Sequence, residues 1–106
     1  MRVVLDTNVI IAAFASRGLC SEVFEVCVSS HTIVFSEHIL SEIKEKLIHK
    51  IKLPHKIVPS IIDYLREVSE TVKPEMIDTH ICRDKDDIKI LETALSGNAR
   101  FIITGD

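Results

Sequence analysis

Two hydrophobic patterns alternate along this chain. Adjacent apolar, mostly β-branched residues occupy positions 2–5, 32–35 and 101–104, and such short runs are typical of strands buried in a parallel sheet. A weaker run at 71–73, which stops at Pro74, is a further candidate strand. Between these runs, apolar residues recur at the spacing of amphipathic helices, which predicts helices near 9–14, 19–28, 36–51, 61–68 and 84–95.

The order of these elements is strand, two helices, strand, two helices, weak strand, helix, strand. Strands that alternate with helices favour a parallel sheet with right-handed crossovers. We therefore predict one α/β domain over residues 1–106, a three-layer α/β/α sandwich with a central parallel sheet. Ser36 offers a hydroxyl N-cap for its helix, and Gly97-Asn98 is a typical helix stop.

Carboxylates stand at matching places in this order. The first strand runs into Asp6, and the last runs through Thr104 and Gly105 into Asp106. Ligands of open α/β sheets bind beyond the carboxyl ends of the strands, and the helices that follow strands begin at that edge. Glu42, in the second turn of the helix opened by Ser36, and Asp87, three residues after the candidate N-cap Asp84, are therefore expected at the same edge.

Four carboxylates in one place would repel one another, and a hard divalent cation removes that conflict. Oxygen ligands suit Mg²⁺ or Mn²⁺, which activates water and polarises a phosphoryl oxygen. Each acid also has an ordinary interpretation as a cap, a turn or a surface residue. The prediction of a metal site depends on their matching topological positions.

Charge and composition add little that is specific. A net charge of −3 is unfavourable for a nucleic-acid binder, but a basic run includes Lys44, Lys46 and Lys50. This run is either a surface that attracts phosphate or a solvated helix face. Three cysteines without CxxC spacing argue against a disulfide scaffold or a thiolate zinc site. No stretch is apolar enough to span a membrane and no signal-peptide pattern is present, so we predict a cytoplasmic protein.

Four segments, in this order, resemble motifs of the PIN-domain family of small metal-dependent ribonucleases, most closely its toxin-like branch in bacteria and archaea. They are Val4-Leu5-Asp6-Thr7-Asn8-Val9, Phe35 through Ile43, Arg83 through Ala94, and Phe101 through Asp106. Relatives usually continue beyond the Thr-Gly-Asp motif, so the chain is expected to lack the usual C-terminal end of the domain.

The resemblance implies roles for individual residues. The catalytic, metal-binding acids would be Asp6, Glu42, Asp87 and Asp106, supported by Asn8, Ser36, Asp84 and Thr104. It implies hydrolysis of RNA by metal-activated water, with Mg²⁺ or Mn²⁺ as cofactor. It further implies the toxin of a toxin–antitoxin pair, with an antitoxin protein as partner and a homodimer as a possible assembly. The alternative is a catalytically inactive PIN module that binds RNA or protein.

Overall fold

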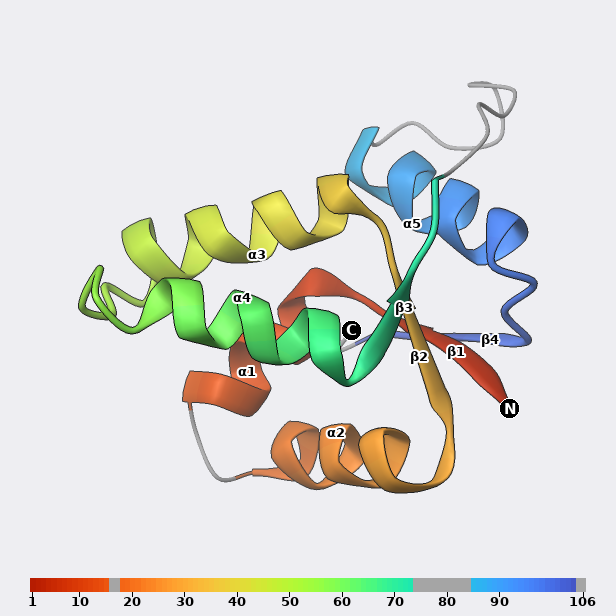
Figure 1. The fold of residues 1–106 in the computed structure, drawn as a ribbon, viewed down its shortest axis with the longest axis horizontal. Coiled ribbons are helices and arrows are strands. Elements are labelled where there is room, and N and C mark those ends of the chain that lie inside the picture. The colour runs from red at the N-terminus through yellow and green to blue at the C-terminus, as the bar shows by residue number, and fades with distance from the viewer. Residues whose placement is uncertain (16–17, 74–84, 105–106) are drawn as a thin grey trace.

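The computed structural model describes residues 1–15, 18–73 and 85–104, and the side chains of the last range from residue 88 onward. Within these ranges four strands and five helices follow the predicted order (Figure 1). They are β1 (Arg2–Leu5), α1 (Thr7–Ala15), α2 (Leu19–Ser30), β2 (Thr32–Phe35), α3 (Glu37–His49), α4 (Val58–Glu67), β3 (Ser69–Thr71), α5 (Lys85–Ser96) and β4 (Phe101–Ile103).

The strands form one parallel sheet in the order β3-β2-β1-β4. Val3 of β1 is paired with Ile33 of β2 on one side and with Phe101 of β4 on the other. The residues Val3, Val4 and Leu5 are buried, as expected for an inner strand whose two faces are both covered. The predicted central parallel sheet is therefore confirmed.

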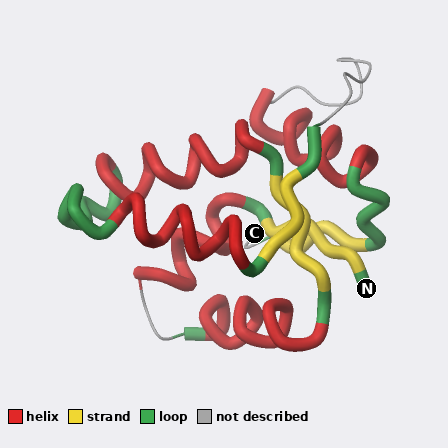
Figure 2. Tube along the Cα trace, in the orientation of Figure 1, coloured by secondary structure: helices red, strands yellow, loops and turns green. Residues whose placement is uncertain are grey.

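Helices cover the sheet on both faces (Figures 1 and 2). Val3 and Cys27 line the same cavity, so the face that carries Val3 and Ile33 lies against α2. Val34 points to the opposite face, where its side chain lies against Gly97 at the end of α5. The predicted three-layer α/β/α sandwich is confirmed by this arrangement, with α3 and α4 packed against each other beside it.

Two predicted helix ends have the expected chemistry. The hydroxyl of Ser36 accepts a hydrogen bond from the Ile39 N–H at 3.3 Å, which makes Ser36 the N-cap of α3. At the end of α5, the Ala99 N–H donates to the Ala94 carbonyl at 2.8 Å, and Asn98 has a φ of 53°. This is the Schellman arrangement, with Asn98 rather than the glycine in the left-handed conformation.

Several predicted boundaries were wrong, including the start of α4, which is Val58 rather than position 61 because Pro59 is accommodated in the first turn. The third strand is Ser69–Thr71 rather than 71–73, because pairing with β2 begins where Ser69 lies opposite Ile33. As a short edge strand with polar residues it lacks the apolar signal of the inner strands. Helix α1 begins at Thr7 rather than at position 9, because the Asp6 carbonyl accepts hydrogen bonds from the Val9 and Ile10 N–H groups. None of the described helices is both long and apolar enough to cross a membrane.

Candidate metal centre at the carboxyl edge of the sheet

Asp6 lies at the point where β1 ends beside β4. Its N–H donates to the Ile103 carbonyl at 2.9 Å, so the two strands stop at the same edge, as predicted, and Thr104 follows there. The Asp6 side chain is half-buried. Its carboxylate makes no hydrogen bond or ion pair with any other residue that the structure describes. A half-buried carboxylate that lacks a partner is available to a cation.

Glu42 lies on the second turn of α3, next to the buried stripe that includes Ile39 and Ile43. Its side chain is only 16% exposed. The Lys46 Nζ atom lies 3.2 Å from Glu42 Oε1, and the His38 Nε2 atom lies 3.9 Å from Glu42 Oε2. The position on the border of the apolar stripe, expected from helical periodicity, therefore gives Glu42 a largely hidden carboxylate.

Lys46 links Glu42 to the segment that begins at Asp6. Its Nζ atom lies 3.4 Å from Asn8 Oδ1 as well as 3.2 Å from Glu42 Oε1. Asn8 is on the first turn of α1, which packs against α3. The structure thus brings Glu42 together with the Asp6-Thr7-Asn8 segment, although 34 or more residues separate them in the sequence.

The other predicted acids can be placed only in part. Asp87 is the third residue of α5, which packs against α3 and β1, but its side chain is outside the described part. Asp84 and Asp106 lie outside the described residues altogether. Among the side chains that are described, no group of three His, Cys, Asp or Glu residues is placed to hold a metal ion. The sequence prediction for these acids stays a prediction.

Thr7 is a site residue that sequence reasoning missed. It is 1% exposed, and its Oγ1 atom finds no hydrogen-bond partner among the described residues. Thr7 directly follows Asp6 at this edge of the sheet, and the candidate ligands of the site, Asp6 and Glu42, offer carboxylate oxygens. Such donors fit Mg²⁺ or Mn²⁺ and do not fit a soft ion. Its position between Asp6 and Asn8 is the sequence signal that could have identified Thr7.

A second acid at the start of α3 is already paired. The guanidinium of Arg66 on α4 donates to both carboxylate oxygens of Glu37, with Nη2 at 2.8 Å from Oε2. These hydrogen bonds hold the pKa of the Glu37 carboxyl below its ordinary value. The pairing makes Glu37 a link between α3 and α4, whereas Glu42 is the acid of α3 that Lys46 connects to Asn8.

The predicted basic run does not share one face of α3. Lys46 and Lys50 line a hollow together with His38 and Glu42. Lys44 lines a different hollow, against Arg66 of α4. A single phosphate-binding track that includes both Lys44 and Lys46 is therefore not what this helix presents.

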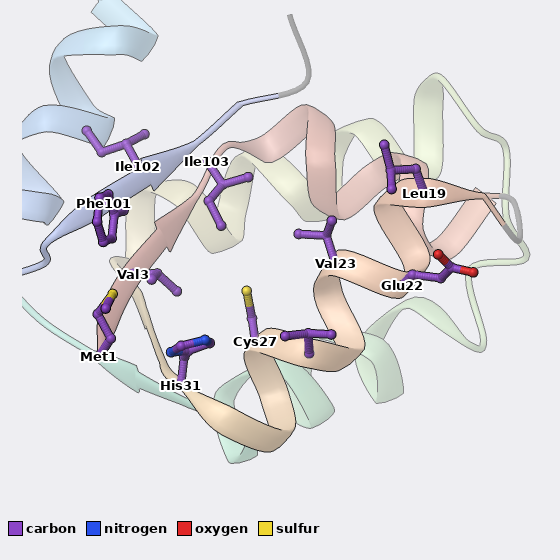
Figure 3. Close-up of a pocket in the computed structure, with 11 residues that line it drawn as sticks. Met1, Val3, Leu19, Glu22, Val23, Cys27, His31, Phe101, Ile102 and Ile103 are labelled. Atoms are coloured by element: carbon purple, nitrogen blue, oxygen red, sulfur yellow. The ribbon is translucent and has the colours of Figure 1, made fainter.

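An apolar cavity of about 520 Å³, whose lining does not include Asp6 or Glu42, lies between α2 and the β1–β4 edge (Figure 3). Its lining includes Val3, Val23, Cys27, Phe101 and Ile103. Burial raises the pKa of the Cys27 thiol, which therefore stays protonated and is a poor nucleophile. The lining of this cavity therefore offers no reactive thiolate.

The fold and this edge define an α/β protein whose polar residues gather where the strands end. The sequence model of the PIN domain family matches residues 2–106, and the chain belongs to that family. Its fold is similar to that of a chain in the crystal structure of VapBC2 from Rickettsia felis bound to a DNA fragment from their promoter. The TM-score is 0.65 at 14% identity, over 100% of each chain. No curated protein matches the chain. The expected family and fold are thereby confirmed.

Proposed function

We propose that this PIN-domain protein is a Mg²⁺- or Mn²⁺-dependent endoribonuclease. The observation that carries the proposal is the Lys46 bridge, which ties the largely hidden Glu42 to Asn8, two residues after an Asp6 carboxylate that has no partner among the described residues. Family membership supports it, because the match to the PIN domain model runs over residues 2–106 and so includes all four acids. Asp87 and Asp106 are proposed to complete the set.

The described residues would have different roles in this site. Asp6 and Glu42 would hold the cation from two different elements, and the Asp6 N–H bond to Ile103 fixes where the first of them stands. The buried Thr7 hydroxyl would orient a ligand from the floor of the site. When bound, the cation would supply Lewis acidity toward a phosphoryl oxygen and a more acidic water.

We further propose that the protein acts as the toxin of a toxin–antitoxin pair. The likeness in fold to a chain of the VapBC2 complex supports this reading. A protein partner would then regulate access to the acidic edge. Co-expression with candidate partner genes, followed by copurification and loss of RNA cleavage, tests this part separately.

One observation favours a second candidate, a catalytically inactive PIN module that binds RNA or protein. The Lys46 ammonium already supplies Glu42 with a cation at 3.2 Å. If Lys46 remains paired with Glu42 at all times, Glu42 cannot act as a metal ligand. The two candidates differ in whether RNA is cut when a divalent cation is supplied.

The deciding experiment is cleavage of a fluorescent RNA by metal-stripped protein, with and without Mn²⁺. Asp6→Asn and Glu42→Gln should each lower the Mn²⁺-dependent rate by more than about 100-fold, since even residues that only support metal ligands cost 10- to 100-fold. Glu25→Gln, at an exposed position on α2, is the matched control and should keep the rate. Cleavage that persists in EDTA, or in Asp6→Asn, would contradict the proposal.

A further inference from the structure

Lys46 is paired with Glu42, an acid that the proposed metal site would also use. Its Nζ atom contacts two oxygens from different elements, Oε1 of Glu42 on α3 at 3.2 Å and Oδ1 of Asn8 on α1 at 3.4 Å. The Glu42 side chain is 16% exposed and that of Lys46 is 31% exposed. The contact is therefore partly shielded from water, and it joins segments that are 38 residues apart along the chain.

We propose that Lys46 is an internal counter-cation, which neutralises Glu42 in the metal-free protein and competes with the divalent cation for it. This inference rests on the proposed metal site. An ammonium and a divalent cation cannot share one carboxylate oxygen at contact distance without strong repulsion, and partial burial strengthens that repulsion. A divalent cation that binds Oε1 must therefore displace Lys46, and one that binds Oε2 is repelled by the ammonium beside it, so Lys46 lowers metal affinity in either case.

The neighbouring lysines show that this arrangement is particular to Lys46. Lys50 is one turn further along the same face of α3 and is exposed, whereas Lys44 lies toward α4. Among the described contacts, neither reaches Glu42. A general basic surface would attract RNA but would not pair with one largely hidden carboxylate and one Asn8 side chain at the same time.

The test measures Mn²⁺ binding to metal-stripped protein by titration calorimetry and does not depend on activity. Lys46→Met keeps an unbranched side chain of nearly the same length and removes its charge. It should tighten the Mn²⁺ dissociation constant by about three- to tenfold, the range expected for removing one nearby positive charge from a partly shielded site. Lys56→Met removes the same charge from an exposed loop position and should stay within about twofold of the wild type. Lys46→Arg keeps the cation and should not tighten binding.

Thermal unfolding gives a second readout. In EDTA, Lys46→Met should melt below the wild type, because Glu42 loses its partner while largely hidden. With Mn²⁺ it should gain more in melting temperature than the wild type, since tighter binding adds more stability. Equal gains would count against the inference.

Each outcome separates the two proposals. If the wild type binds Mn²⁺, Asp6→Asn does not, and Lys46→Met binds no tighter or more weakly, the metal site stands and the counter-cation role is overturned. If only Lys46→Met binds Mn²⁺, Lys46 blocks the site, which supports the counter-cation and rejects the nuclease proposal for the natural chain. If neither protein binds, both proposals fail.

Discussion

Thr7→Val removes a hydroxyl from the carboxyl edge of the sheet and should make the metal-free protein more stable. The Thr7 Oγ1 atom is buried and has no hydrogen-bond partner among the described residues. Valine has nearly the same shape, so the packing of the side chain is kept while the cost of burying an unpaired hydroxyl disappears. A buried unsatisfied polar group costs about 1–3 kcal/mol. We expect a gain of about 1–2 kcal/mol, or roughly 4–8 °C in Tm for each kcal/mol.

Ser36 provides the matched control, because it is also a fully buried hydroxyl in this part of the fold. Its Oγ atom accepts a hydrogen bond from the Ile39 N–H. Ser36→Ala should therefore lose about 1 kcal/mol, the usual value of an N-cap. The two substitutions remove similar atoms and should change the free energy of unfolding in opposite directions.

Urea denaturation in EDTA, followed by circular dichroism, measures both changes. A titration with Mn²⁺ then tests function, where Thr7→Val should weaken binding by about tenfold if its hydroxyl supports the metal ligands. A gain in stability with a loss of metal affinity is the signature of a residue kept for its function. If Thr7→Val instead loses about as much stability as Ser36→Ala, the hydroxyl has a structural partner and this reasoning is refuted.

Two further predictions concern the frame that holds the site. Gly97→Ala should lower the free energy of unfolding by about 1–3 kcal/mol, because a Cβ at this position would lie 2.5 Å from Val34 Cγ1 and overpack the site. A gain of about 0.4–1 kcal/mol, which is usual for Gly→Ala, would contradict this expectation. The pKa of Glu37 is lowered by its hydrogen bonds from Arg66, so its contribution to stability is present above the ordinary carboxyl pKa and is lost as the pH falls through the lowered value. In Glu37→Gln the free energy of unfolding should therefore fall less steeply as the pH is lowered, which denaturation between about pH 6 and 3 measures. The same pH dependence in the variant and the wild type would count against the ion pair.

Local signals explain why much of the fold was predictable. The inner strands β1 and β2 are short runs of apolar residues buried on both faces, and Ser36 stands directly before an amphipathic helix. Such features depend on neighbours in the sequence. Strand β3 was misplaced because its residues are polar and partly exposed, so only pairing with β2 defines it.

In the candidate site, too, some features depend on neighbours in the sequence and others on how distant segments pack. Helical spacing alone places Lys46 one turn after Glu42, so their ion pair is a local feature. The contact of Lys46 with Asn8 depends on how α1 packs against α3, and no pattern in the sequence encodes that distance. The burial of Thr7 likewise follows from packing, although its neighbours Asp6 and Asn8 were both named as candidate site residues from the sequence.

The proposed nuclease function requires that a divalent cation binds where β1 and β4 end. Paramagnetic broadening of backbone amide signals by substoichiometric Mn²⁺ locates the ion directly in the ¹⁵N-labelled protein. We expect the broadening to be strongest at Asp6, Thr7, Glu42 and Thr104 and to be lost in Asp6→Asn. Broadening centred on the exposed acids of α2, Glu22 and Glu25, or uniform weak broadening over the whole protein, would contradict it.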